Sequence, residues 1–302
     1  MKIPIRSENV FQNDSDRPFV TCRLFGQMGN QLYQIATTLA YSWDYDAIAL
    51  FPALHQQMDR ISYNRDRIFF RLDASMPPRS LRAVFEEESF YSSKKIPFQP
   101  DQLLVGYFQC WNHFHHHRER ILQVFAPSAT VETYLQSKYQ SLLDRTDTVG
   151  VHVRTWVKSN HLSKIHPFIG FDYYREALEL FPKDATFVIF SDRINWCKVH
   201  FPKQFDRKFV FIDSNDGVED FFLMTKMRNL IACNSTYSLW GAYLNQNPEK
   251  LIISPKYCPH YYPEFPFHDY FLPEWKLLPV TIDHPYPEDM EWYDACTQSV
   301  NG

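Results

Sequence analysis

Residues 216–255 read DGVEDFFLMTKMRNLIACNSTYSLWGAYLNQNPEKLIISP, and this stretch decides the fold. Apolar residues recur at helical spacing over 217–228, which predicts an amphipathic helix. Residues 230–233 form a short apolar run, which is typical of a buried strand in a parallel sheet. A second helix is predicted at 239–244 and a further strand at 250–254, closed by Pro255. This alternation indicates an α/β protein with a parallel sheet.

Polar side chains separate the first of these strands from the second helix, namely Asn234, Ser235, Thr236 and Ser238. In an open parallel sheet, the turn after a strand faces the ligand crevice. The first N–H groups of the following helix are unpaired, and together with the helix dipole they favour an anion. The turn therefore predicts a phosphate or diphosphate site, and the alternative is that Asn234 or Ser235 simply caps the helix.

The same stretch resembles the family 11 glycosyltransferases, the bacterial-type alpha-1,2-fucosyltransferases. Their signature Asn-Ser-Thr-Phe-Ser-Trp-Trp-Gly-Ala corresponds to residues 234–242, where this chain has Tyr237 and Leu239 for the phenylalanine and the first tryptophan. Further family-like stretches are Gly-x-x-Gly-Asn-Gln-Leu-Tyr-Gln at 26–34, Gly-Tyr-Phe-Gln at 106–109 and Leu-Pro-Glu-Trp at 272–275. The resemblance implies two Rossmann-like domains with parallel, doubly wound sheets that face a cleft, the arrangement called GT-B.

Length and composition narrow the class of protein. The 302 residues suffice for one large or two medium domains, and 45% hydrophobic with 22% charged residues is typical of a soluble globular protein. The net charge of −4 argues against nucleic acid as a partner, because neutralising phosphates needs a basic face. Aromatic residues make up 17% of the chain; such rings suit sugar faces, but most are expected in the core.

The six cysteines are scattered without a CxxC pair, so we expect a reduced, cytoplasmic protein without disulfides. The N-terminus lacks an apolar signal segment, and no run of about 18 apolar residues occurs. We therefore expect neither a transmembrane segment nor a Golgi-type anchor, while peripheral association with a membrane stays open.

Four regions are predicted along the chain. Residues 1–18 form a polar tail, 19–145 an N-terminal domain, 146–259 a C-terminal domain, and 260–302 an aromatic and proline-rich extension that packs across the domains. The resemblance implies that the N-terminal domain lies on the acceptor side and that the C-terminal domain binds a GDP-sugar. In the first domain a strand at 19–25 leads through a glycine turn to a helix at 32–43, but residues 55–100 are irregular. The second domain alternates strands at 148–154, 186–190 and 208–212 with helices at 172–181 and 194–201.

The glycine turn is the second predicted anion site, formed by Gly26, Gly29, Asn30 and Gln31. Glycines let the backbone approach a ligand closely, and the next helix again presents its N-terminus. A Gly-x-x-Gly turn is a weak signal by itself. Its match to the N-terminal signature of the resembled family strengthens the prediction.

A third predicted element is the strand end at 150–154, which places His152 and Arg154 on one face. An arginine fork grips a phosphate well, and the alternative is a structural ion pair. The family sequence His-x-Arg-Arg-Gly-Asp is kept only through the first arginine, because Thr155, Trp156 and Val157 follow. This departure removes one cation, and Trp156 is expected either to stack on a ligand or to lie in the core.

Two carboxylates complete the predicted donor site. Asp192 ends the Phe-Ser-Asp run, and it either accepts hydrogen bonds from a ribose or base, or caps the next helix. Asp220 lies in the first turn of the helix at 217–228, where an acidic residue is favourable by itself. By resemblance to the wider fucosyltransferase superfamily, Asp220 and His152 are candidates for binding guanine.

Metal sites are not favoured by the sequence. In a helix predicted at 111–125, His113 and His117 share a face, but no cysteine or HExxH pattern accompanies them, so a solvated, partly packed helix face is the preferred interpretation. Two Asp-x-Asp triplets, at 14–16 and 44–46, lie in the tail and at a helix end. The resemblance implies a metal-independent enzyme, and no cofactor is expected.

The resemblance thus implies transfer of L-fucose from GDP-fucose to a galactoside hydroxyl, with alpha-1,2 linkage and inversion. Arg154 and the two turns would stabilise the departing diphosphate. The base that accepts the acceptor's proton is not settled by the sequence; His161, His166 and Asp172 lie downstream of the arginine. The alternatives are a transferase for another nucleotide sugar and a non-catalytic member that binds a carbohydrate or nucleotide.

Overall fold

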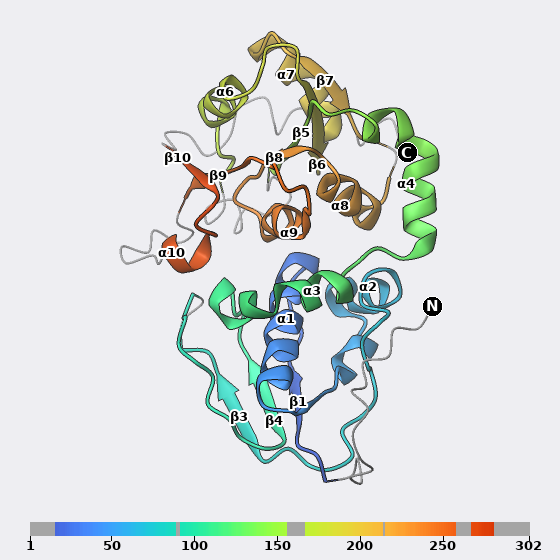
Figure 1. Ribbon diagram of the computed structural model, residues 1–302, viewed down its shortest axis with the longest axis vertical. Coiled ribbons are helices and arrows are strands. Elements are labelled where there is room, and N and C mark those ends of the chain that lie inside the picture. The colour runs from blue at the N-terminus through green and yellow to red at the C-terminus, as the bar shows by residue number, and fades with distance from the viewer. Residues whose placement is uncertain (1–15, 89–90, 156–166, 214, 258–266, 281–302) are drawn as a thin grey trace.

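The computed structural model describes residues 16–88, 91–155, 167–213, 215–257 and 267–280, and it contains two parallel sheets (Figure 1). The four-stranded sheet has the order β2-β1-β4-β3, and the six-stranded sheet has the order β10-β9-β8-β5-β6-β7. Figure 1 shows the sheets in opposite halves of the molecule, with α1, α2 and α3 of one half facing α8 and α9 of the other. The predicted α/β fold with two parallel sheets is confirmed.

The first half is built from short elements. Its strands are β1 (Phe19–Cys22), β2 (Ile48–Ala49), β3 (Ala83–Glu86) and β4 (Gln102–Val105). Its helices are α1 (Met28–Asp44), α2 (Ile61–Arg67), α3 (Arg118–Val124) and the 3-10 turns η1 (Pro52–His55), η2 (Met58–Arg60), η3 (Trp111–His113) and η4 (His115–His117). The helix α4 (Ala129–Leu143) leads to the second half.

The second half has longer strands with strongly apolar sequences. Its strands are β5 (Thr148–Val153), β6 (Thr186–Ser191), β7 (Lys208–Phe211), β8 (Asn229–Ile231), β9 (Ile252–Lys256) and β10 (Lys276–Pro279). Its helices are α6 (Phe171–Glu179), α7 (Ile194–Gln204), α8 (Gly217–Thr225), α9 (Thr236–Leu244) and α10 (Phe267–Tyr270). Every residue of β5 is buried, because this strand lies at the centre of the sheet.

The order of the strands indicates where a ligand binds to the second sheet. Numbered along the chain, its strands run 3-2-1-4-5-6, the order of a Rossmann fold. The order reverses between β5 and β8, which pair in parallel through Val149 and Asn229. Ligands bind outside the carboxyl ends of the strands at such a switch point. The residues that follow β5 and β8 are therefore the expected ligand contacts.

Several element boundaries differ from the sequence predictions. Both helices that follow polar turns begin earlier than predicted, at Met28 and Thr236, because their first turns contain the glycine and hydroxyl residues that the apolar spacing leaves out. Pro255 lies inside β9 rather than after it. It is tolerated there because β8 pairs with β9 only as far as Ile253, so the missing N–H of Pro255 breaks no ladder bond to β8.

The helix predicted at 111–125 is wrong in its first half, where the chain forms the two 3-10 turns η3 and η4. Phe114 separates these turns with a backbone φ of −145°. Its buried ring stacks on Trp240 of α9 with centroids 5.4 Å apart. Tertiary packing of this ring thus overrides the helical pattern of the local sequence.

The described part of the C-terminal extension contacts both halves of the molecule. β10 is the sixth strand of the second sheet, while the carbonyl of Tyr270 in α10 accepts a 2.7 Å hydrogen bond from the indole of Trp111 in the first half. None of the helices that the structure describes is both long enough and apolar enough to cross a membrane.

Buried aromatic rings join the two halves. Tyr33 of α1 and Trp111 of η3 contact Trp240 of α9, with centroids 5.2 and 5.5 Å apart, and Trp111 stacks on Tyr243 at 4.7 Å. These rings belong to one apolar core that includes residues of both halves. The two sheets therefore hold a fixed arrangement, and much of the aromatic content fills this core as predicted.

Candidate active site

The predicted ligand residues meet in one cavity between the two halves. Its volume is about 650 Å³, within the range of about 300–1,000 Å³ that is common for small-molecule sites. All but two of the predicted donor-site residues line it: Gly26, Gly29, Asn30, His152, Arg154, Asp192, Asp220, Asn234, Ser235 and Thr236. These residues come from the carboxyl ends of β1, β5, β6 and β8 and from the start of α8.

Three helices begin at this cavity, and their first turns differ in charge. At α8 the side chain of Asp216 caps the N–H groups of Val218 and Glu219, and the first turn contains two acidic residues. At α1 and α9 no side chain of the described residues caps the helix, and neither first turn contains an acidic residue. The open, acid-free starts of α1 and α9 suit an anion, whereas the acidic start of α8 suits a ligand that donates hydrogen bonds.

The starts of α1 and α9 touch each other. Thr236 Oγ1 donates a 3.1 Å hydrogen bond to Oδ1 of Asn30, which also accepts from Nε2 of Gln109 at 3.0 Å. A Cβ added to Gly29 would lie 2.5 Å from Thr236 Oγ1 and 2.7 Å from the Tyr237 nitrogen. This contact requires glycine at position 29, and it brings both helix starts to one point in the cavity.

Gln31 and Ser238 are the two predicted ligand residues that do not line the cavity. The amide of Gln31 is fully buried and donates to the carbonyl oxygens of Gly26 at 2.6 Å and Asp59 at 3.1 Å. The hydroxyl of Ser238, also fully buried, accepts from the N–H of Cys233 and donates to the carbonyl of Ser235. Both side chains therefore shape the anion-binding turns from behind rather than offering groups to a ligand.

Arg154 follows β5 and forms an ion pair with Asp192, with Nε 3.5 Å from Oδ2. The Asp192 carboxylate also accepts from the N–H of Thr155 at 3.2 Å and from its hydroxyl at 3.3 Å. The cap of α7 is Arg193, so Asp192 does not cap that helix. Asp192 instead fixes the chain after β5 and the orientation of the guanidinium beside the cavity.

The Thr155 side chain is fully buried and lies outside the cavity lining. Position 155 therefore supplies no cation to the cavity, where the family sequence has its second arginine. Trp156 and Val157 lie outside the described residues.

His152 is buried between the sheet and α9. Its Nδ1 lies 3.1 Å from Sγ of Cys233, and its ring packs against Tyr237 with centroids 5.1 Å apart. Burial, followed by the charge of Arg154, lowers the pKa of His152 to about 3, while burial raises the pKa of the Cys233 thiol to about 12. The imidazole of His152 is therefore neutral and carries a single N–H, and its Nδ1 is paired with the Cys233 thiol.

Asp220 is the acidic group that α8 contributes to the cavity. Burial, assisted by the nearby charges of Asp216 and Glu219, raises its pKa to about 6, although the side-chain amide of Asn215 donates to it at 3.0 Å. A partly desolvated carboxylate with few partners gains strongly from a ligand that donates two hydrogen bonds.

Asn234 and Ser235 begin the turn after β8. The amide nitrogen of Asn234 donates to the carbonyl of Pro167 at 2.9 Å, and its buried Oδ1 accepts no bond from any described residue. Ser235 holds the N-cap position of α9, but its side chain makes no capping bond within the described chain. The simple capping alternative is therefore not what the structure shows.

Sequence reasoning did not predict that the 3-10 turn η2 forms part of the cavity wall. Asp59 and Arg60 line the cavity with left-handed backbone angles, φ 52° and 57°. Such angles are uncommon for residues other than glycine and cluster at functional sites. The Asp59 carboxylate accepts from the N–H of Gly26 at 2.8 Å, and Arg60 lies over the Tyr63 ring at 4.2 Å. Residues 55–100 gave no signal because this role depends on a contact with the distant glycine turn.

The remaining predictions can be placed as follows. Asp172 is 98% exposed at the start of α6 and does not line the cavity, which removes it as a base; His161 and His166 lie outside the described residues. The four cysteines in the described chain are buried and free, as predicted: Cys22, Cys110, Cys197 and Cys233. Most of the 14–16 triplet lies outside the described residues, while Asp46 of the second triplet pairs with Arg17.

Curated relatives share sequence with much of the chain. An O-antigen biosynthesis glycosyltransferase, WbnK of Escherichia coli, is 28% identical over 55% of this chain and 58% of its own length. An Escherichia coli alpha-1,2-colitosyltransferase is 27% identical over 78% of this chain and 91% of its own length. Galactoside alpha-(1,2)-fucosyltransferase 1 of Leontopithecus chrysomelas is 30% identical over 72% of this chain and 63% of its own length.

Solved structures share the fold at low sequence identity. The fucosyltransferase NodZ from Bradyrhizobium matches with a TM-score of 0.54 and 11% identity, over 75% of this chain and 92% of that chain. The NodZ alpha-1,6-fucosyltransferase soaked with GDP-fucose matches with a TM-score of 0.53 and 12% identity, over 76% and 93%.

The family model described as glycosyl transferase family 11 matches residues 12–278, which includes both sheets and every residue of the cavity. The resemblance drawn from the motifs is thereby confirmed: this chain belongs to glycosyl transferase family 11.

Proposed function

We propose that this protein transfers L-fucose from GDP-fucose to a hydroxyl of a galactoside, forming an alpha-1,2 linkage with inversion at the anomeric carbon. The observation that carries the proposal is the meeting of Arg154 with the uncapped starts of α1 and α9 in one cavity. Family membership and the fucosyltransferase relatives support the choice of reaction.

The two ends of the donor fit different parts of the cavity. The diphosphate accepts hydrogen bonds from the first N–H groups of α1 and α9 and pairs with the guanidinium of Arg154. Guanine donates from its ring N–H and its amino group to the Asp220 carboxylate, beside the imidazole of His152. These hydrogen bonds offset the cost of the burial that raises the pKa of Asp220.

Departure of GDP is the demanding step, because negative charge develops on the diphosphate as the glycosidic bond breaks. Fixed N–H dipoles and a positioned guanidinium stabilise that charge without rearranging, which is the largest catalytic term in many enzymes. The ion pair with Asp192 keeps Arg154 in place for this task. Arg60 adds a second cation from the opposite wall, where position 155 provides none.

A donor screen tests the proposal. The purified protein is incubated with a galactoside acceptor and, in parallel, with GDP-fucose, GDP-mannose and UDP-galactose, and release of nucleotide and the linkage of the product are measured. GDP release with a fucosylated galactoside supports the proposal. Binding of GDP without turnover of any sugar donor would instead identify a non-catalytic member.

Transfer of another sugar is the second candidate, favoured by the similarity to the alpha-1,2-colitosyltransferase. A GDP-linked colitose in the same screen separates the two. Preference for that donor over GDP-fucose would revise the sugar while leaving the diphosphate site as described.

A further inference from the structure

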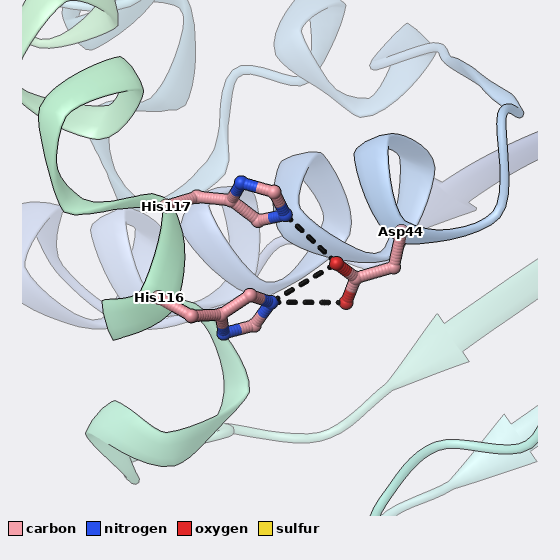
Figure 2. A group of neighbouring side chains, drawn as sticks. All are labelled: Asp44, His116 and His117. Atoms are coloured by element: carbon pink, nitrogen blue, oxygen red, sulfur yellow. Dashed lines mark hydrogen bonds and ion pairs between the residues drawn. The ribbon is translucent and has the colours of Figure 1, made fainter.

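A cluster of side chains that could bind a metal ion lies at the end of α1 farthest from the cavity (Figure 2). Asp44 is the last residue of α1, and His116 and His117 are consecutive residues of η4. Nε2 of His117 lies 2.8 Å from Oδ1 of Asp44, and Nε2 of His116 lies 3.0 and 3.1 Å from its two oxygens. The three ligand atoms lie within 4.8 Å of one another.

A single imidazole faces the carboxylate in an ordinary histidine–aspartate pair, such as that of exposed His268 with Asp269, where Nε2 lies 3.5 Å from Oδ2. The cluster at Asp44 differs because His116 and His117 both point their Nε2 atoms at Oδ1 of Asp44, as Figure 2 shows. Their ring centroids are only 4.4 Å apart, so a single ion can contact both rings and the carboxylate at once.

The surroundings hold the ring of His117 in place before any ion binds. The ring of His117 packs edge-on against Trp43 at 5.1 Å, and the guanidinium of Arg120 covers Trp43 at 3.9 Å. The N–H of His117 donates to the carbonyl of Phe114, whose ring is fixed in the core. Preorganised ligands lose little conformational freedom on binding a metal, which favours affinity.

We propose that Asp44, His116 and His117 bind one divalent transition-metal ion of the zinc class. Two imidazole nitrogens and one carboxylate oxygen suit zinc, cobalt or nickel better than magnesium or calcium, which prefer oxygen ligands. Zinc binds such atoms at about 2.0–2.1 Å, so the three groups need only a small outward shift to surround an ion. At least one coordination position remains for water.

The location assigns the ion a structural role. α1 has 17 residues and rises about 1.5 Å per residue, so the cluster lies about 25 Å from the end of the helix that borders the cavity. An ion at that distance makes no contact with the reacting groups. It ties the C-terminus of α1, where the helix dipole favours a cation, to the turn that precedes α3. The inference is independent of the proposed transferase function.

The test uses the full-length protein without a histidine tag, stripped of metal with a chelator and then titrated with zinc chloride by calorimetry. The wild type is compared with His116→Gln/His117→Gln and with His268→Gln, which removes an exposed imidazole beside an aspartate elsewhere. Melting curves with and without zinc, and the visible spectrum with cobalt, provide readouts that do not depend on activity. Circular dichroism in chelator checks that each variant is folded.

We expect one zinc ion per wild-type chain and per His268→Gln chain, with affinity at least about tenfold weaker in the double variant. At zinc concentrations about 100-fold above the dissociation constant, the melting temperature of the wild type should rise by a few degrees, since the ion binds the folded state. Equal zinc affinity in the wild type and the folded double variant would overturn the proposal, as would the absence of stoichiometric binding to the wild type.

Discussion

Replacing Gly29 by alanine tests whether the starts of α1 and α9 form one site. The added Cβ would lie 2.7 Å from the carbonyl carbon of Thr236 and from the nitrogen of Tyr237, at least 0.7 Å short of ordinary contact at 3.4 Å. Backbone atoms cannot rotate away as a side chain can, so the helix starts must separate. Overpacking of this kind costs about 1–3 kcal/mol of stability. A misplacement approaching 1 Å lowers the rate of transfer by about 100-fold.

The assay measures GDP affinity by calorimetry, turnover of GDP-fucose and the melting temperature. Gly241→Ala is the matched control, because it makes the same change in α9 but meets only the flexible Met224 side chain, with Sδ at 3.0 Å. We expect this control to bind GDP like the wild type. If Gly29→Ala also bound GDP and turned over donor at wild-type levels, the idea of a shared site at the two helix starts would be refuted.

Three further predictions concern charge. The folded state keeps the proton of Asp220 up to about pH 6, against an ordinary pKa of 3.8, so stability falls as pH rises through this window. Asp220→Asn should therefore be more stable than the wild type at pH 7.5, by about 3 kcal/mol at most, and equally stable below pH 4. Urea unfolding at both pH values measures the difference in free energy. Equal stability of the two proteins at pH 7.5 would contradict the prediction. Arg60→Ala, compared with Arg60→Lys, should weaken GDP binding about tenfold through the lost cation, and an unchanged affinity would remove Arg60 from the site. Turnover should be insensitive to EDTA, since cations of the chain hold the diphosphate; strong inhibition reversed by magnesium would show that a metal is required.

Local patterns predicted the parts of the site that depend on neighbouring residues in the chain. The turns at 26–31 and 234–238 were identifiable because each joins a strand to a helix and contains residues that leave the helix start open. The same logic found Arg154, since it follows the largely apolar strand β5, which is fully buried. Parallel strands end on one side of a sheet, and this rule gathers the three segments without further information.

Contacts between distant residues explain what the sequence did not predict. Asp59 meets Gly26 across 33 residues and adopts a backbone angle that its residue type rarely takes. Asp44 meets His116 across 72 residues, whereas the i, i+4 spacing placed His113 and His117 on one face of a helix whose first half does not form. The sequence showed Thr155 as a departure from the family pattern, but it did not indicate that Arg60 supplies a cation from the opposite wall of the cavity.

The central claim is that Arg154 and two open helix starts hold the diphosphate of a guanine nucleotide. Calorimetric titration of the wild type and Arg154→Ala with GDP and with guanosine tests it most directly, because the two ligands differ only in the diphosphate. We predict that the substitution weakens GDP binding by about 10–100-fold, as expected for a lost charge-assisted contact, while leaving guanosine affinity unchanged. Equal loss for both ligands, or no loss for GDP, would contradict the claim.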